Sequence, residues 1–451
     1  MMAGQRGHHT SLLTDLYQLT MLQSYWLEGM EGEAVYDMTI RRLPEQRNFL
    51  VAAGVESAIE LLEALRFTPE DIDYLAGLGH FQDAFLQWLG EFRFTGDLYA
   101  LPEGSIFFPP TPIVQVVAPL PQAQLVETAL MNQIHFQSAI ASKAARVHIA
   151  AGGKPVMEFG LRRCYGADAG LQASRSAYLG GTSITSNVAA AAHYGIPLSG
   201  TMAHAFIMSH TSELEAFRAY QKLYPTGALL VDTYDTLEGV RNLIRLRDER
   251  PNDFQIKAIR LDSGDLAELA RQSRLLLDQA GLPEVKIYVS GGLDETSVAE
   301  LEATGAPIDA YAVGTSLGVC ADAPSMECAY KCALFDGRPL MKMAPGKRSY
   351  PGHKQLYRQR QADGTLKLDQ LELAGQTEPV GTPQLQKMMA GGQRCVEASS
   401  GTLEAARNRF MEQLSGLPPE LRSLQPAKQP WQVEIGPALN LAVEQLLQQA
   451  R

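Results

Sequence analysis

A histidine stands at the end of residues 198–204 (LSGTMAH), where glycine, hydroxyl and small side chains separate two apolar stretches. This pattern predicts that His204 lies where a strand ends, and in a chain of repeating strands and helices the strand ends form the wall of the active site. An imidazole at that place can act as a nucleophile, a base or a metal ligand. An isolated histidine is more often a hydrogen-bonded structural residue, so the interpretation depends on its companions.

An arginine and two aspartates follow a mostly apolar stretch, within residues 260–265 (RLDSGD). Arg260 offers a planar fork that suits a carboxylate or a phosphate, and Asp262 could hold Mg²⁺ or sugar hydroxyls. Charges gathered at the end of a strand indicate a ligand site. The structural alternative is an Arg–Asp pair in which Ser263 or Asp265 caps the next helix.

Two consecutive turns join a strand to a helix through glycine, in residues 287–295 (IYVSGGLDE) and 310–318 (AYAVGTSLG). Glycine lets the backbone approach a ligand closely, and the residues that follow present free N–H groups. In βα barrels the last two such loops often form a phosphate site. The tandem turns therefore predict a phosphate-binding edge.

An aromatic residue lies beside two arginines in residues 157–163 (MEFGLRR). Phe159 with a nearby arginine would suit a flat anionic ring, although a core phenylalanine beside solvated arginines fits equally well. Residues 229–236 (LLVDTYDT) resemble a nucleotide motif superficially and also fit a buried strand that ends in a helix cap. The sequence contains neither GxxxxGK[ST] nor GxGxxG, which disfavours a P-loop NTPase or an ordinary dinucleotide-binding domain.

The composition of the chain sets broad limits on its class. Its 451 residues are enough for two or three domains, and a net charge of −11 disfavours a nucleic-acid partner. Five cysteines without a CxxC pair predict neither a disulfide framework nor a zinc knuckle. The first residues contain no apolar signal region, and no apolar run has the length of a membrane span. We therefore expect a soluble, cytoplasmic protein.

The elements that must position these residues alternate between strand and helix from about residue 155. Such alternation predicts parallel βα units and an irregular βα barrel of the α/β class. Helices are expected near residues 213–222, 236–247 and 267–279. The expected strands are residues 156–160, 181–186, 197–201, 228–233, 255–261, 285–290 and 308–313.

The two ends of the chain do not show this regular alternation of strand and helix. Before the barrel we expect a helix that begins near Thr14 and Asp15, a strand at 35–40, two helices near 54–66 and 80–90, a β segment at 96–121 and one long helix that ends near 151. After residue 328, Asp336 and Gly337 predict a hairpin, residues 359–400 predict surface loops and short strands, and a helix closes the chain from about 436. The expected parts are residues 1–150, the barrel with the active site at 151–328, and residues 329–451.

Together these segments resemble the nicotinate phosphoribosyltransferase family, nearly from end to end. The resemblance implies an irregular βα barrel packed against an α/β domain that is built from both chain ends. It also implies a head-to-tail homodimer with active sites at the interface. The matching segments are residues 14–18 (TDLYQ), 158–163, 180–187 (GGTSITSN), 199–204, 230–236, 261–265, 311–316 and 351–358 (PGHKQLYR).

The resemblance also assigns roles to residues. His204 would be phosphorylated transiently by ATP, and the phosphohistidine would favour tight binding of phosphoribosyl pyrophosphate before the sugar is transferred. Arg260 and Asp262 complete the expected catalytic set, with Asp262 also the expected Mg²⁺ ligand. The other expected substrate-binding residues are Tyr17 and Phe159 on the two faces of the pyridine ring, with Tyr17 supplied by the neighbouring subunit, Arg162, Thr201 at nicotinate, Asp294 at ribose hydroxyls or Mg²⁺, and Gly314 and Thr315 at the 5-phosphate.

Three competing functions stay open at this stage. The related nicotinamide phosphoribosyltransferases place an aspartate where this chain has residues 181–183 (GTS), and an aspartate would repel the carboxylate of nicotinate. Quinolinate phosphoribosyltransferase also has a βα barrel but lacks the full-length match. A catalytically inactive metabolite-binding paralogue is disfavoured by the complete set at His204, Arg260 and Asp262. Only Cys395 lies beyond residue 332, so we expect no zinc, and the role of Arg41 stays open.

Overall fold

The computed structural model describes residues 10–249, 251–344, 346–375, 381–395 and 401–449, and its chain divides into two compact units. Unit 1 consists of Met1–Ala139 with Ser325–Arg451, so both ends of the chain contribute to it, and unit 2 is Ile140–Pro324. The boundary falls within the long helix α6 (Glu127–Ala150). The expected α/β class is confirmed.

Unit 1 is built on a seven-stranded sheet with the order β13-β12-β1-β5-β3-β17-β18. Its central strand β1 pairs antiparallel with β12 from the second half of the chain and with β5 from the first half, which joins the two chain ends in one sheet. Its strands are β1 (Glu33–Ile40), β3 (Asp97–Ala100), β5 (Pro112–Pro119), β12 (Cys328–Phe335), β13 (Arg338–Pro339), β17 (Gln386–Ala390) and β18 (Gln393–Arg394).

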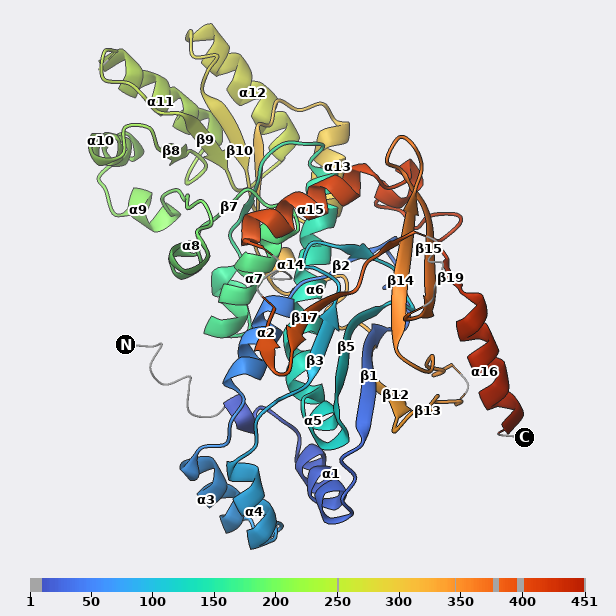
Figure 1. Ribbon diagram of the computed structural model, residues 1–451. Helices are drawn as coiled ribbons and strands as arrows, with labels where there is room; N and C mark the ends of the chain where they lie inside the picture. The colour runs from blue at the N-terminus through green and yellow to red at the C-terminus, as the bar shows by residue number, and fades with distance from the viewer. Residues whose placement is uncertain (1–9, 250, 345, 376–380, 396–400, 450–451) are drawn as a thin grey trace. The chain divides into compact units, whose positions relative to one another are not determined.

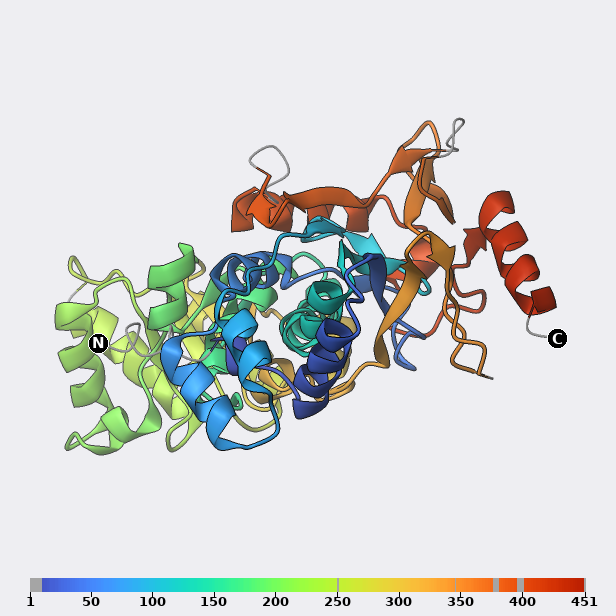
Figure 2. The same cartoon turned by 60° about the horizontal axis from the view of Figure 1, so that its bottom comes forward.

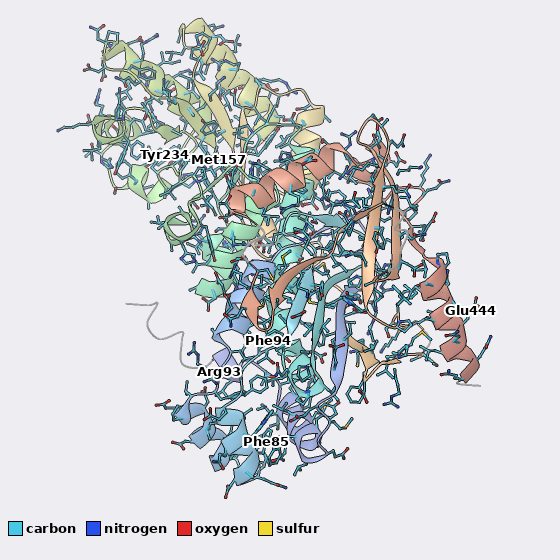
Figure 3. All side chains as sticks on the ribbon, viewed as in Figure 1. Phe85, Arg93, Phe94, Met157, Tyr234 and Glu444 are labelled. Carbon is cyan, nitrogen blue, oxygen red and sulfur yellow. The ribbon has the colours of Figure 1, made fainter. Side chains whose placement is uncertain are left out.

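Helices accompany this sheet in unit 1. Helices α3 and α4 lie side by side (Figures 1 and 2), and the aromatic ring of Phe85 in α4 (labelled in Figure 3) stacks near Trp88 and Trp26. Helix α3 was not predicted from the sequence. The helices are α1 (Leu16–Leu27), α2 (Val55–Ala64), α3 (Pro69–Gly77), α4 (Asp83–Gly90), α5 (Leu120–Leu125), α15 (Leu403–Ser415) and α16 (Pro437–Gln449).

The hairpin expected at Asp336 and Gly337 is confirmed, since both residues take positive φ angles, 48° and 72°, between paired strands β12 and β13. The expectation of loops and short strands over residues 359–400 was partly wrong. Strands β14 (Lys354–Arg360) and β15 (Leu366–Leu373) form a long antiparallel pair within the sheet β16-β14-β15-β19. The remaining strands of unit 1 are β2 (Leu50–Val51), β4 (Ile106–Phe107), β16 (Thr382–Pro383) and β19 (Val433–Ile435).

Unit 2 contains a curled sheet of six parallel strands in the order β7-β6-β11-β10-β9-β8. The last strand in sequence, β11, pairs with the first, β6, so the sheet curves back on itself as a barrel does. Helix α12 (Leu266–Gln279) packs on β9 and β10 (Figure 1). The strands are β6 (Val156–Glu158), β7 (Ile184–Thr185), β8 (Ala228–Leu230), β9 (Ala258–Leu261), β10 (Lys286–Val289) and β11 (Ala310–Val313).

The barrel is open between residue 198 and β8. The strand expected at residues 197–201 is reduced to one parallel bridge between Leu198 and Thr185, and it pairs with no other described residue. Pro197 lacks an N–H donor, and Gly200 weakens extended structure, so the segment leaves the sheet at once. His204 therefore does not end a strand; it begins the short helix α9 (His204–Met208) three residues after Thr201.

The remaining helices of unit 2 follow its strands. They are α7 (Ala167–Leu179), α8 (Val188–Tyr194), α10 (Glu213–Leu223), α11 (Thr236–Glu249), α13 (Glu295–Ala303) and α14 (Thr315–Gly318). Inside the sheet, Met157 (labelled in Figure 3) packs with Ala310 and Ala312, and Phe159 and Tyr288 surround them. In the part of the chain that is described, no helix combines the length and the apolar character needed to cross a membrane.

Candidate active site

Arg260 is the centre of the polar network at the end of β9. Its Nε donates to Ser290 Oγ at 2.7 Å, its Nη1 to Thr201 Oγ1 at 2.9 Å and its Nη2 to Asp262 Oδ1 at 2.6 Å. These three bonds fix the plane of the guanidinium, whose side chain is 15% exposed. A mostly buried, pre-oriented guanidinium is suited to a planar anion because little side-chain entropy is lost when the ligand binds.

Asp262 is held as an ionised carboxylate. Burial raises its pKa, but hydrogen bonds from Ser290 and Arg260 and the positive charge of Arg260 lower the pKa below its ordinary value. Its backbone N–H donates to Asp232 Oδ2 at 2.8 Å, and the Ser263 hydroxyl donates to the same oxygen at 2.6 Å. The end of β9 is thereby tied to the loop after β8.

His204 is held by its two ring nitrogens between a hydroxyl and a carboxylate. Nδ1 lies 3.1 Å from Thr233 Oγ1, and Nε2 lies 3.7 Å from Asp262 Oδ2. The side chain is 41% exposed, so a solvent-borne reactant can reach the ring. When Nδ1 carries the proton and donates a hydrogen bond to Thr233 Oγ1, the lone pair of Nε2 is free to attack an electrophile.

Arg260, Asp262 and His204 line one pocket of about 320 Å³, a volume suited to a small ligand. The guanidinium carbon of Arg260 lies 5.7 Å from the centre of the Phe159 ring, which puts an aromatic face and a positive charge on the same pocket. Such a pair suits a flat, anionic aromatic molecule. The lining residues are Phe159, Leu161, Arg162, Ser186, Gly200, Thr201, Met202, Ala203, His204, Leu230, Arg260 and Asp262.

Phe159 is positioned by its buried neighbour Glu158, which was not predicted from the sequence to belong to the site. Glu158 ends β6 and is 1% exposed, and its carboxylate accepts from the Gly160 N–H, from Ser174 Oγ at 2.9 Å and from Thr185 Oγ1 at 2.6 Å. These bonds join β6, α7 and β7 around the turn that carries Phe159. Because glutamates are seldom fully buried, position 158 could have been singled out by its place at the end of an apolar strand.

Asp232 is a second acid that was missed, because residues 229–236 fit a helix cap equally well. It is 8% exposed, and its Oδ1 is buried without a hydrogen-bond partner among the described residues. A buried carboxylate oxygen without a partner costs free energy unless a ligand or an ion binds to it. No group of three or more His, Cys, Asp and Glu residues that could hold a metal occurs in the described ranges.

Other expected residues lie outside this pocket. The Asp294 carboxylate caps α13 by accepting from the Ser297 N–H at 2.8 Å. Gly314 packs on the backbone of Phe159, since a Cβ at Gly314 would lie 3.0 Å from the Phe159 carbonyl oxygen, and Thr315 beside it is exposed. Residues 181–183 do not line the pocket, whereas Ser186 does. Arg260 and Arg162 are the basic residues that line this pocket.

Tyr17 belongs to unit 1, on α1, where its ring is 48% exposed and its hydroxyl accepts from Gln18 Nε2 at 2.8 Å. Partial burial and the nearby Glu127 raise the pKa of Tyr17, so the phenol stays neutral at physiological pH. Arg41 lines a separate pocket of unit 1, of about 260 Å³, together with the basic residues Lys331 and Arg348. This cluster of positive charge is suited to an anion.

Segments of both units match known proteins. Residues 12–135 match the nicotinate phosphoribosyltransferase (NAPRTase) N-terminal domain, and residues 155–332 match the nicotinate phosphoribosyltransferase (NAPRTase) family. The chain is 49% identical over 420 residues to nicotinate phosphoribosyltransferase pncB2 of Mycobacterium tuberculosis, covering 93% of this chain and 90% of that protein. The chain belongs to the nicotinate phosphoribosyltransferase family.

Further family members agree with this assignment. Nicotinate phosphoribosyltransferase of Bacillus subtilis is 42% identical over 364 residues, which cover 79% of this chain and 74% of that protein. The structure of human nicotinic acid phosphoribosyltransferase superposes with a TM-score of 0.85 at 29% identity, covering 96% of this chain and 99% of that one. The family expected from the sequence motifs is therefore confirmed.

Proposed function

We propose that the protein transfers the phosphoribosyl group of phosphoribosyl pyrophosphate to nicotinate, giving nicotinate mononucleotide and pyrophosphate for NAD biosynthesis in the cytoplasm. The observation that carries the proposal is the Arg260 guanidinium, fixed by three hydrogen bonds and 5.7 Å from the Phe159 ring centre. The ring of nicotinate would lie on Phe159, with its carboxylate at the fork of Arg260 and the hydroxyl of Thr201. Arg162 at the rim adds a second positive charge.

The reaction forms a bond between the pyridine nitrogen and C1 of the ribose and breaks the bond from C1 to the pyrophosphate oxygen. Its transition state should resemble an oxocarbenium ion, so most of the catalysis is positioning and electrostatic stabilisation. Asp262 stays ionised in this pocket and would stabilise positive charge that develops on the ribose. The loops that contain Gly292, Asp294, Gly314 and Thr315 would hold the ribose and its 5-phosphate.

Two acids of the site would supply oxygen ligands to a magnesium ion, with water and the pyrophosphate as the others. Asp262 Oδ2 is not engaged by Arg260, and Asp232 Oδ1 has no hydrogen-bond partner among the described residues. Carboxylate oxygens are the ligands that Mg²⁺ prefers. Bound there, Mg²⁺ would stabilise the negative charge of the leaving pyrophosphate.

We further propose that ATP drives this reaction through His204. Nδ1–H would keep its proton and donate a hydrogen bond to Thr233 Oγ1, while Nε2 would attack the γ-phosphate, forming a phosphorus–nitrogen bond, breaking the bond to the β,γ-bridging oxygen and releasing ADP. The exposure of the His204 side chain supports this step, because the γ-phosphate must be able to reach Nε2. The phosphohistidine would favour binding of phosphoribosyl pyrophosphate, and its hydrolysis after each turnover would reset the enzyme.

The proposal includes a homodimer in which Tyr17 of a neighbouring subunit covers the second face of the pyridine ring. Its exposed ring is available for such a contact. The nearest alternative function is nicotinamide phosphoribosyl transfer. The charged fork of Arg260 favours the acid because a neutral amide would leave the guanidinium without an anionic partner.

A turnover assay with the purified protein tests the function. Nicotinate and nicotinamide are each incubated with phosphoribosyl pyrophosphate and Mg²⁺, with and without ATP, and the pyridine nucleotides are separated by chromatography. Nicotinate mononucleotide should form readily, ATP should increase its yield, and nicotinamide should react far more slowly. Equal catalytic efficiency with both bases would contradict the assigned substrate, and product formation indifferent to ATP would contradict the coupling.

A further inference from the structure

A fully buried lysine of unit 2 joins two acids that lie far apart in the sequence. Lys143 on α6 is 2% exposed, and its Nζ pairs with Glu295 Oε2 and lies 3.0 Å from Asp322 Oδ1. Arg146, one turn further along α6, donates from Nε to Glu295 Oε1 at 2.9 Å. Burying such charges costs free energy that their mutual attraction often only balances, so the cluster is a poor device for stability alone.

The two acids follow the two glycine turns of the barrel. Glu295 is the first residue of α13, directly after the turn that contains Gly291 and Gly292. Asp322 lies four residues after α14 ends, beyond the turn at Gly314. Lys143 thus connects the segments that follow β10 and β11.

Each of these turns packs directly on the site. A Cβ at Gly291 would lie 1.9 Å from the carbonyl oxygen of Asp262, and one at Gly314 would lie 3.0 Å from the carbonyl oxygen of Phe159. Displacing either turn would therefore change the surroundings of the pocket. A cation that holds both turns to the same helix also fixes the distance between them.

We propose that Lys143 is a positioning residue for phosphoribosyl pyrophosphate. It holds the turns after β10 and β11 in one arrangement, so that both meet the 5-phosphate of the ribose together. The inference rests on the proposed function, which assigns that phosphate to these turns. The nicotinate half of the pocket is fixed instead by Arg260, Thr201 and Phe159, whose hydrogen bonds and ring contact do not involve Lys143.

The test substitutes Lys143→Met, which keeps the length of the side chain and removes its charge. The matched control is Lys154→Met, because Lys154 pairs with Glu302 at 2.6 Å near the other end of α13. For each protein we would measure KM for both substrates, kcat, and direct binding of phosphoribosyl pyrophosphate by calorimetry. Thermal denaturation shows that every variant is folded at the assay temperature.

Lys143→Met should raise KM and the dissociation constant for phosphoribosyl pyrophosphate at least about tenfold, because small misplacements of binding groups are costly. KM for nicotinate should stay within about twofold, and Lys154→Met should leave both constants unchanged. A merely structural role would lower the amount of active protein or alter both substrates alike. Unchanged binding of phosphoribosyl pyrophosphate by Lys143→Met, or an equal rise in both KM values, would overturn the proposal.

Asp322→Asn provides a second test if Lys143→Met does not fold. It removes the charge of one acid only, and should weaken phosphoribosyl pyrophosphate binding in the same direction by a smaller factor. If Asp322→Asn changes nothing, the inference is wrong. A wild-type protein that neither binds phosphoribosyl pyrophosphate nor forms nucleotide would overturn the proposed function and this inference together, whereas an active wild type with a normal Lys143→Met overturns the inference alone.

Discussion

Nε2 of His204 lies 3.7 Å from Oδ2 of Asp262, while Oδ1 of the same carboxylate accepts a hydrogen bond from Arg260 at 2.6 Å. A single carboxylate therefore stands between the exposed imidazole and the guanidinium that faces the aromatic ring of the pocket. A charge added to the imidazole would act on that carboxylate at short range. This arrangement gives a physical route by which phosphorylation of His204 could change the binding of substrates.

Replacing His204 by alanine should uncouple ATP hydrolysis from nucleotide synthesis. Without the imidazole no phosphohistidine can form, yet transfer of the sugar requires no histidine nucleophile. Slow, ATP-independent synthesis should persist with weaker binding of phosphoribosyl pyrophosphate. Incubation with γ-labelled ATP and Mg²⁺ should give an acid-labile, base-stable label on the wild type only, and a labelled His204→Ala variant would show that another residue is phosphorylated.

Arg260→Lys should reduce discrimination between nicotinate and nicotinamide by about 10²-fold, measured as the ratio of their kcat/KM values. The charge is kept, but an ammonium cannot reproduce the fork that bonds to Thr201, Ser290 and Asp262. Thr201→Val should reduce this discrimination by a smaller factor, because it removes one hydrogen-bond partner of Arg260 and leaves the guanidinium in place. Undiminished preference for nicotinate in Arg260→Lys would mean that the carboxylate is recognised elsewhere.

Ser290→Ala should shift the acid limb of the pH–activity profile to higher pH. Burial raises the pKa of Asp262, whereas hydrogen bonds from Ser290 and Arg260 and the charge of Arg260 lower it below 3.8. Because the pKa of Asp262 is lowered in the folded protein, its ionised form adds to the free energy of unfolding at pH above the ordinary pKa. This stabilisation is lost as the pH falls through the lowered pKa of the folded state. Losing the serine hydroxyl moves the pKa upward; an unshifted acid limb measured by kcat/KM would contradict the assignment of Asp262.

Gly291→Ala and Gly292→Ala should have different effects although both glycines take left-handed angles, φ 97° and 70°. A Cβ at Gly291 would lie 1.9 Å from the Asp262 carbonyl, whereas one at Gly292 meets nothing within 4 Å. Gly292→Ala should cost about 1 kcal/mol of stability from backbone strain. Gly291→Ala should in addition disturb the end of β9 and abolish most activity; equal activity in the two variants would refute the close packing.

Tyr17→Ala should raise KM for nicotinate about tenfold, through lost ring stacking and burial. If the neighbouring subunit supplies Tyr17, mixed dimers of Tyr17→Ala and His204→Ala should regain ATP-coupled activity at nicotinate concentrations below the raised KM, because one of the two sites then has both residues intact. The measurement is activity after subunit exchange, which is monitored separately by mass. Exchange without recovery would show that the site is not shared.

The sequence predicted the elements of unit 2 better than those of unit 1. In unit 2 the strands alternate regularly with helices, and only residues 197–201 failed, because Pro197 and Gly200 interrupt extended structure. In unit 1, helix α3 was missed although Thr68 and Asp71 form a capping box, in which each side chain bonds to the backbone of the other residue. Strand β15 (Leu366–Leu373) was not placed because its leucines lose the two-residue period between Leu368 and Leu371, and its buried positions include the charged residues Asp369 and Glu372.

The composition of the site was predictable in part, for a geometric reason. The carboxyl ends of parallel strands meet at one edge, so Phe159 and Arg260 could be placed together from their positions in the sequence alone. His204 lines the same pocket although it begins α9 and does not end a strand, so the expected neighbours were right for His204 but the expected element was wrong. The partnership of Ser290 with Arg260 depends on the register between β9 and β10, which no local pattern specifies. The unpaired oxygen of Asp232 likewise depends on how the loop after β8 packs.

The most direct test of the assigned reaction follows one incubation of purified protein with nicotinate, phosphoribosyl pyrophosphate, ATP and Mg²⁺ by proton and phosphorus NMR. Nicotinate mononucleotide and pyrophosphate should appear in a one-to-one ratio as nicotinate disappears, and ADP should accumulate with them. Conversion of phosphoribosyl pyrophosphate to ribose 5-phosphate without any pyridine nucleotide, or no consumption of nicotinate at all, would contradict the account.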